Sequence, residues 1–216
     1  MSFGPRTESR KERMAESGSR VIPANEYRRA RWKNCLGWTR EIVRARVRDD
    51  ADCIDADDWD VRLSIAEVER KAAFSLYPGI DRELVLLRGN GLRLHFTDGE
   101  MRELSHPGER LRFAGERALD GEPIDGPTHD FNLMWRRDLL QAELHHRPLV
   151  GSMLFFTAPG TTWAIHLMSG RARFDADSAL PPLEAGDTAM LIDHDARRRY
   201  RLEGAGELLS ICLTVR

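Results

Sequence analysis

Hydrophobic and polar residues alternate with a period of two over much of this chain, which is typical of β-strands. From Thr39 to Val47, one set of alternate positions reads Thr-Glu-Val-Ala-Val and the other reads Arg-Ile-Arg-Arg. The pattern predicts a strand with one solvated face. Glu41 falls on the more apolar face, where a carboxylate needs a cationic partner or a ligand. A salt bridge to a nearby arginine is the simpler interpretation.

Short stretches of the same kind recur to the C-terminus, separated by turns that contain glycine. Further strands are predicted at 59–66, 84–87, 92–96, 111–113, 129–135, 152–157, 162–167, 172–174, 188–192, 199–202 and 208–215. Residues 139–144 fit either a strand or a helix. Strands this short and this evenly spaced predict an all-β barrel or sandwich.

The predicted strand 129–135 separates two kinds of side chain. Three large apolar residues share one face, and Asp130, Asn132 and Met134 share the other. Polar side chains two residues apart on a strand face can point at the same place. This arrangement suits the recognition of a ligand. A turn-stabilising aspartate that merely neighbours an asparagine is the alternative.

The segment 32–42 concentrates unusual chemistry in eleven positions. It combines Trp32 and Trp38 with a lysine, an amide, a thiol, a hydroxyl, an arginine and a carboxylate, and Gly37 interrupts it. Either the indoles anchor a core and need a partner for their N–H groups, or the segment lines a pocket in which a few polar groups converge on a ligand. The segment alone does not decide between them.

Length and charge narrow the class of protein. The chain has 216 residues, of which 41% are hydrophobic and 31% are charged, and its net charge is −2. This fits one large β-domain or two small ones with a real core. Nucleic acid is not an expected partner, because such proteins carry a basic patch or stripe.

The N-terminus and the cysteines suggest a cytoplasmic protein. Residues 1–20 form a polar, charged tail that we expect to be disordered. This tail lacks the apolar core of a signal peptide, and no run reaches the roughly 18 apolar residues of a membrane span. Three widely spaced cysteines without a C-x-x-C pair predict free thiols in a reducing compartment.

Two further features suggest metal binding at first sight but have simpler interpretations. Residues 49–60 contain seven aspartates in twelve positions. They lack the glycine and terminal glutamate of an EF-hand, so a solvated acidic loop is expected. The adjacent His145 and His146 face opposite ways if they lie on a strand, which predicts surface positions rather than shared ligation.

An internal repeat relates the two halves of the chain. Residues 86–94 and 167–174 share the order of apolar strand, glycine turn and alternating strand. Each is followed by a second glycine and an acid, at Gly108-Glu109 and at Gly186-Asp187. This order resembles the cupin barrel, and two copies imply a bicupin. We expect one half at 21–135, carrying the ligand pocket, and the other at 136–216.

The repeat lacks the residues with which cupins usually bind a metal. The expected glutamate of the first half falls on Arg82, and the expected histidines of that half fall within 75–78, where there are none. Trp163 and the stretch 158–161 occupy the matching places of the second half. Neither half supplies three or four ligands, so no metal or other cofactor is expected. An arginine in place of a carboxylate favours an anionic ligand, such as a carboxylate bound by a guanidinium group.

Four separated motifs resemble the HutD/Ves family. They are Trp32-Lys33-Asn34 with Gly37 and Thr39-Arg40-Glu41-Ile42, then Arg62-Leu63-Ser64-Ile65-Ala66, then Phe74-Ser75 with Pro78-Gly79-Ile80-Asp81-Arg82, and Asp130-Phe131-Asn132-Leu133-Met134. The resemblance implies a bicupin associated with bacterial histidine utilisation, without established catalysis. Its implied role is regulatory, through binding of formiminoglutamate, formylglutamate or urocanate. This chain departs from the family pattern in placing Cys35 and Leu36 before the glycine.

The resemblance supplies a set of candidate ligand-binding residues. Cationic side chains would hold a carboxylate, and neutral polar ones would bind an amide or formimino group. The set is Trp32, Lys33, Asn34, Thr39, Glu41, Arg62, Ser64, Phe74, Ser75, Asp81, Arg82, Asp130, Asn132 and Met134.

Other functions stay open at this point. The chain could be a hydrolase or lyase acting on the same metabolites, with Glu41 or Asp81 as general base or Cys35 as nucleophile. It could instead be a structural or partner-binding protein that forms a homodimer through exposed strand edges. A third alternative is a salt-bridged barrel interior without any ligand.

Overall fold

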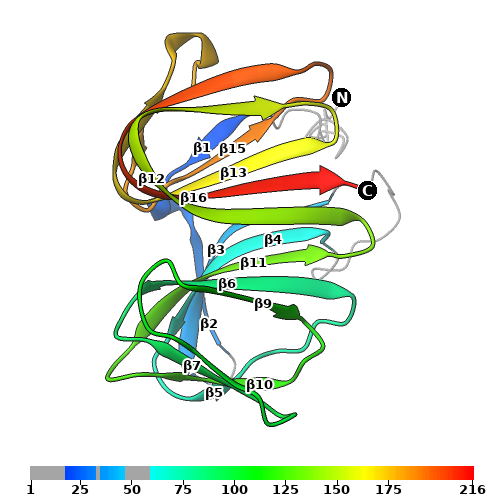
Figure 1. Ribbon diagram of the computed structural model, residues 1–216, viewed down its shortest axis with the longest axis vertical. Helices are drawn as coiled ribbons and strands as arrows, with labels where there is room; N and C mark the ends of the chain where they lie inside the picture. The colour runs from blue at the N-terminus through cyan, green and yellow to red at the C-terminus, as the bar shows by residue number, and fades with distance from the viewer. Residues whose placement is uncertain (1–17, 33–34, 47–58) are drawn as a thin grey trace, which may run out of the picture.

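Three stacked β-sheets make up the protein (Figure 1). The computed structural model describes residues 18–32, 35–46 and 59–216. Most of the first half of the chain forms a central and an outer sheet, and the second half forms most of the C-terminal sheet. The prediction of an all-β fold is confirmed. Each run of paired strands ends at two edge strands, so among the described residues no sheet closes into a ring.

The sheets contain the following strands in their spatial order. The central sheet has β2 (Arg28–Arg31), β3 (Gly37–Ala45), β4 (Val61–Val68), β11 (Thr128–Arg136), β6 (Ile80–Arg88) and β9 (Arg110–Ala114). The outer sheet has β5 (Ala72–Ala73), β10 (Leu119–Pro123), β7 (Leu92–Phe96) and β8 (Met101–Leu104). The C-terminal sheet has β1 (Arg20–Ile22), β15 (Thr188–Ile192), β13 (Thr161–Phe174), β16 (Arg198–Val215) and β12 (Leu140–Thr157), with β14 (Leu183–Glu184) beside β13. Two 3₁₀ turns, η1 (Ala24–Glu26) and η2 (Ala176–Ser178), complete the elements.

The central sheet is covered on both faces. On one face, Leu63, Phe131 and Leu133 pack with Leu209 and Ile211 of the C-terminal sheet, and all five are fully buried. In Figure 1 this contact lies between the middle and upper layers. The apolar face predicted for residues 129–135 is therefore the contact between the two halves.

The opposite face of the central sheet meets the outer sheet. Leu84 and Leu86 of β6 pack there with Leu92 and Leu94 of β7, and all four have no exposed surface. Strand alternation separates the two faces, because successive side chains point to opposite sides. The polar residues of the same face lie beyond this apolar cluster and form the site described below.

Three strands of the C-terminal sheet are longer than the sequence pattern predicted. Residues 162–167 and 172–174, expected as two strands, belong to the single strand β13, which pairs continuously with β16 except at one register shift. Gly170 and Gly206 are opposite each other in this pair. A Cβ on either glycine would lie 1.9 Å from a carbonyl oxygen of the partner strand. Glycine here permits two backbones to approach closely, so the strand continues where a turn was predicted.

The first described strand belongs to the second half of the molecule. β1 pairs antiparallel with β15, so Val21 lies opposite Ala189. β11 ends at Arg136 and all later strands lie in the C-terminal sheet, but residues 20–22 also join that sheet. Tyr27 extends this link, because its hydroxyl group donates to the carbonyl oxygen of Gly186 at 2.6 Å.

Replacing Gly170 by alanine should destabilise the fold far more than the same change at Gly151. Both glycines have φ near +80°, but a Cβ at Gly151 meets nothing within 4 Å. Gly151→Ala should lower the free energy of unfolding by about 1–2 kcal/mol, the cost of a left-handed residue. Gly170→Ala should lower it by more than about 3 kcal/mol because two backbones must separate. Urea unfolding followed by circular dichroism measures both, and equal losses would contradict the close-approach argument.

Candidate functional site

A cavity of about 670 Å³ lies in the N-terminal half, between the central sheet and the segment that leads into β6. Nine of the predicted residues line it: Trp32, Thr39, Arg62, Ser64, Phe74, Ser75, Arg82, Asn132 and Met134. Arg31, Ala66, Ala73, Leu76 and Tyr77 complete the lining. The four separated sequence motifs therefore meet at one place in the structure.

Strand register explains why residues from distant motifs converge. Met134 on β11 lies opposite Arg62 on β4 and opposite Arg82 on β6, so these three form one row across the sheet. In the next row, Asn132 lies opposite Ser64. Residues two positions apart on a strand point to the same face of the sheet, so both rows face the same side. Two arginines, a serine and an asparagine are thus directed into the cavity together.

Arg82 is the most deeply buried cation of the cavity wall. Its side chain is 4% exposed, and its guanidinium carbon lies 5.2–5.7 Å from the ring centres of Phe74, Tyr77 and Phe113. One terminal nitrogen donates to the carbonyl oxygen of Ser75 at 3.3 Å, while Nε has no hydrogen-bond partner among the described residues. Burial lowers the pKa of Arg82 to about 10, so it stays a cation at neutral pH. The site therefore holds a positive charge with unused donor capacity.

Asp130 and Asn132 bring buried acceptors to the same region. Asp130 has no exposed surface, and neither of its carboxylate oxygens accepts a hydrogen bond from a described residue. The same is true of Oδ1 of Asn132. Burial raises the pKa of Asp130 to about 7, and the charge of Arg82 partly opposes that rise. Asp130 does not line the cavity itself, but it lies two residues from Asn132 on the same face of β11 and opposite Ala66, and both of these residues do.

Trp32 and Thr39 form the wall contributed by the tryptophan-rich segment. The indole nitrogen of Trp32 donates to Oγ1 of Thr39 at 2.8 Å, and its ring meets Phe74 edge-on at 6.3 Å. Gly37 fits beneath this ring, since a Cβ there would lie 2.5 Å from the carbonyl oxygen of Glu67 and 3.0 Å from the ring of Trp32. The indole thus packs as an anchor and also lines the pocket. The structural interpretation of the segment and the pocket interpretation therefore both apply to Trp32.

Glu41 is neutralised by arginines, as the simpler interpretation of its position predicts. Its Oε2 accepts from Nε of Arg62 at 3.0 Å and from a terminal nitrogen of Arg44 at 2.5 Å. A register shift falls between Glu41 and Val43, and it reverses the alternation that the sequence suggested. Glu41 therefore lies beside the cavity arginine Arg62 rather than on the apolar face with Val43.

Asp81 does not contribute to the cavity. It precedes Arg82 on β6, and consecutive strand residues point to opposite faces. Its carboxylate pairs with Arg112 at 3.0 Å and with Arg137 at 2.9 Å, away from the cavity lining. Asp81 and Arg82 were predicted to share the site because they lie in one sequence motif. As consecutive strand residues they point to opposite faces of the sheet.

Some predicted residues lie outside the described part of the chain. The structure does not describe Lys33, Asn34, residues 1–17 or residues 47–58, and the last range contains most of the acidic stretch. Cys35 is described and is exposed, with a positive φ of 58°. Glycine adopts this left-handed conformation more readily than other residues do.

The sequence prediction missed several lining residues, of which Arg31 and Tyr77 bear on the chemistry. Arg31 stacks on Trp38 at 4.7 Å and donates to the carbonyl oxygen of Cys35. Tyr77 lies within the third motif, between Ser75 and Pro78, and its aromatic character was the available signal. Arg31 lies on a strand of exposed residues and gave no such signal.

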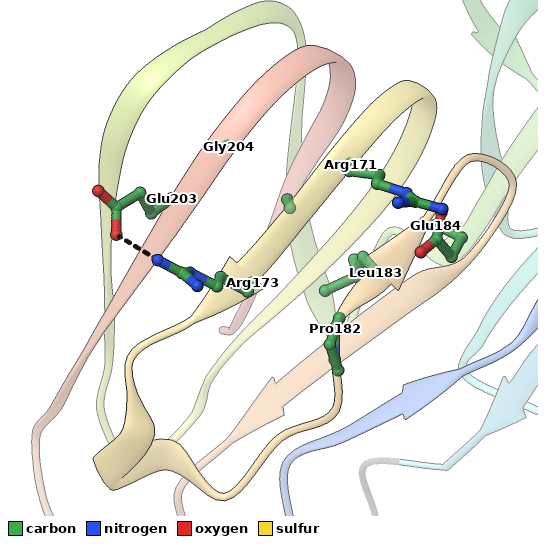
Figure 2. Close-up of a pocket in the computed structure, with 8 residues that line it drawn as sticks. Arg171, Arg173, Pro182, Leu183, Glu184, Glu203 and Gly204 are labelled. Atoms are coloured by element: carbon green, nitrogen blue, oxygen red, sulfur yellow. Dashed lines mark hydrogen bonds and ion pairs between the residues drawn. The ribbon is translucent and has the colours of Figure 1, made fainter.

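A second, open cavity of about 490 Å³ lies on the C-terminal half (Figure 2). Its charged residues form two ion pairs, Arg171 with Glu184 at 2.8 Å and Arg173 with Glu203 at 4.0 Å. Both arginines are more than 70% exposed. Exposed and paired charges contribute little to specific binding, so the first cavity is the candidate site.

Within residues 18–32, 35–46 and 59–216, no three His, Cys, Asp or Glu side chains gather closely enough to hold a metal ion. No helix in that part of the chain is long and apolar enough to cross a bilayer.

Comparison with known proteins agrees with the four motifs. The sequence model of the family named HutD matches residues 24–210. This chain belongs to the HutD family. The HutD/Ves family is associated with histidine utilisation, and the resemblance expected from the sequence is confirmed.

Individual HutD relatives cover much of the chain. An uncharacterized 21.2 kDa protein in the hutC 3′ region of Pseudomonas putida is 34% identical over 124 residues, and the match spans 57% of this chain and 62% of that protein. Protein Ves of Cronobacter sakazakii is 31% identical over 70% of this chain and 76% of its own length. HutD from Pseudomonas fluorescens, solved in a formate condition, has a TM-score of 0.76 at 26% identity, covering 92% of this chain and 100% of that one.

The fold extends beyond the HutD family. The pirin YhhW of Escherichia coli, solved in complex with nickel(II), has a TM-score of 0.63 at 10% identity and covers 91% of this chain and 99% of that one. At this identity the likeness concerns the fold alone. It shows a fold of the cupin kind for the chain, which is the fold that the sequence predicted.

The buried carboxylate of Asp130 should make stability depend on pH. Its folded pKa of about 7 lies above its ordinary value of 3.8, so its contribution to stability is fully present below pH 3.8 and is lost as pH rises to about 7. Asp130→Asn should therefore stabilise the protein relative to wild type at pH 8, by up to about 4 kcal/mol, and by little near pH 4. Unfolding midpoints of both proteins across this range measure the difference. A difference that does not change with pH would contradict the assignment.

Proposed function

We propose that this protein binds a small anionic metabolite of histidine catabolism in the cavity of its N-terminal half and thereby modulates histidine utilisation. The candidates are formiminoglutamate, formylglutamate and urocanate, each of which carries a carboxylate. Binding needs neither a metal ion nor another cofactor in this proposal. The partner is the metabolite itself, and neither nucleic acid nor a membrane takes part.

The observation that carries the proposal is the unsatisfied guanidinium group of Arg82. A buried cation is costly unless it is paired and hydrogen-bonded, and here Nε has no acceptor among the described residues. Aromatic rings surround the group instead of carboxylates in hydrogen-bond contact. A carboxylate that enters the cavity can supply both the charge and the acceptors through a charge-assisted pair.

Neutral polar groups beside Arg82 suit the rest of such a ligand. Ser64 and Asn132 lie in one row of the sheet and both line the cavity. Oδ1 of Asn132 lacks a donor and would accept from an N–H group, which formiminoglutamate and formylglutamate both carry. Phe74 and Trp32 add flat apolar walls. Few polar groups in a largely aromatic pocket are typical of small-molecule sites.

The second cation, Arg62, contributes less net charge. It is paired with Glu41, and Arg44 approaches the same carboxylate oxygen. This neutralisation limits the attraction that Arg62 offers to a ligand. We therefore assign the carboxylate to Arg82 and a hydrogen-bonding role to Arg62.

The structure gives the catalytic alternative little support. A general base needs a carboxylate that faces the substrate with a suitable pKa. Glu41 is bound by two arginines, and Asp81 lies on the opposite face with two others. Ligand binding with a regulatory role requires no general base and therefore fits the residues of the site. A cytoplasmic location and a homodimer formed through exposed strand edges remain part of the proposal.

Removing the guanidinium group should abolish tight binding. Isothermal titration with N-formimino-L-glutamate, N-formyl-L-glutamate and urocanate should give heat with at least one ligand. Arg82→Ala should weaken that binding about 10- to 100-fold, because charge-assisted hydrogen bonds contribute about 1.5–3 kcal/mol. Arg82→Lys should recover part of the loss, since it keeps the charge without the planar fork.

Asp81→Asn is the matched control for this experiment. It changes the neighbouring residue of β6 on the other face, so affinity should stay within about twofold of wild type. Thermal unfolding of each variant establishes that it is folded. Absence of heat with all three ligands, or equal affinity of the Arg82→Ala protein, would overturn the proposed function.

A further inference from the structure

Asp130 has no direct role in the binding scheme above, because it does not line the cavity. Its side chain is nevertheless fully buried, and both oxygens lack hydrogen-bond donors among the described residues. An ionised carboxylate in this setting is unfavourable. It lies on the same face of β11 as Asn132 and opposite Ala66, and both of these residues line the cavity.

The charged groups around Asp130 come from few elements. From β6, Arg82 interacts with it electrostatically. Arg62 of β4 and Tyr77 interact in turn with Arg82. On β11 itself, the neighbours of Asp130 on its own face are the uncharged residues Thr128 and Asn132.

Among the described residues, Arg82 is the charged group that acts on the pKa of Asp130. An apolar cluster adjoins this region. It consists of Leu84 and Leu86 of the central sheet packed against Leu92 and Leu94 of the outer sheet. Two histidines lie on the far face of the central sheet. His129 interacts there with Glu67, and His166 packs on Phe131. Burial lowers the pKa of His166 to about 3, so it stays neutral above pH 6.

We propose that Asp130 is a positioning residue that couples anion binding at Arg82 to the uptake of one proton. This inference rests on the proposed function, since it specifies how that same site regulates its affinity. Ionised Asp130 offsets part of the positive charge of Arg82 and repels an incoming carboxylate. Protonated Asp130 does neither, so the guanidinium group presents its full charge to the ligand.

The proton balance follows from this competition. A carboxylate that binds Arg82 adds a negative charge near Asp130 and favours its protonated form, so a proton from solvent binds an Asp130 carboxylate oxygen as the ligand enters. Affinity must then rise as pH falls through about 7, the pKa of Asp130 in the ligand-free protein. Between that pKa and the higher pKa of Asp130 in the ligand-bound protein, each binding event takes up close to one proton. A change in pH near neutrality would thus change how much metabolite the protein retains.

Calorimetric titration of wild type and Asp130→Asn at pH 6, 7, 8 and 9 tests the coupling, with N-formyl-L-glutamate and formate as probes. Each titration is run in phosphate and in Tris, whose ionisation enthalpies differ, so that proton uptake is read directly. We expect wild-type affinity to fall about tenfold or more from pH 6 to pH 9, with uptake near one proton at pH 8. Asp130→Asn should bind with the same affinity at every pH and take up no proton.

Asp125→Asn is the matched control. Asp125 is exposed in the turn before β11 and has a positive φ that asparagine also tolerates. This variant should reproduce the wild-type pH profile. If Asp130→Asn also reproduces that profile, or if wild type binds without proton uptake at pH 8, the proposal is wrong.

A second measurement separates this inference from the proposed function. The carbon-13 resonance of the Asp130 carboxyl group, assigned by its loss in Asp130→Asn, is titrated against pH with and without saturating formate. If the three metabolites give no heat but formate raises the midpoint of this titration, the proposed ligand class fails and the coupling stands. If formate leaves the midpoint unmoved, the coupling fails whatever the metabolites do.

Discussion

The central sheet is buried on both faces, and the rest of the molecule is arranged around that constraint. Its strands alternate between a face of large apolar side chains, such as Leu63 and Leu133, and a face that combines leucines with polar residues. The apolar face holds the two halves together. The other face is closed by the outer sheet at one end and opens into the cavity at the other. A period of two along β4, β6 and β11 therefore separates what stabilises the protein from what is available for binding.

The cavity face carries charges that stability alone does not explain. Arg82 is enclosed by aromatic rings, and the buried Asp130 accepts no hydrogen bond from the part of the chain that the structure describes. Replacing buried charges by apolar residues of similar size is often neutral or stabilising, so their retention at one cavity is typical of a functional site. Arginine suits this position because its guanidinium group is weakly hydrated and stacks on aromatic faces. The same features leave Nε of Arg82 without an acceptor among the described residues.

The two halves are connected by more than the chain that joins them. β1 adds to the C-terminal sheet, and the hydroxyl group of Tyr27 lies 2.7 Å from Oγ1 of Thr188, which in turn lies 3.0 Å from Nδ1 of His166. These contacts fix the segment that continues into β2 and Trp32. The cavity wall built by that segment is thus held against the C-terminal half. In this way the second half, whose own cavity has paired and exposed charges, supports the site in the first.

The sequence by itself determined the all-β class and the two faces of residues 129–135, because local alternation survives in any register. Its resemblance to the HutD/Ves family supplied nine of the residues that line the cavity. The sequence also contained the alternation that separates Asp81 from Arg82, although the shared motif obscured it. The tertiary structure alone decided that a bulge moves Glu41 beside Arg62, that Asp130 stays outside the cavity lining, and that β13 continues through Gly170. These outcomes depend on which strands pair and in which register. Pairing is set by packing between residues far apart in the chain, and no local pattern encodes it.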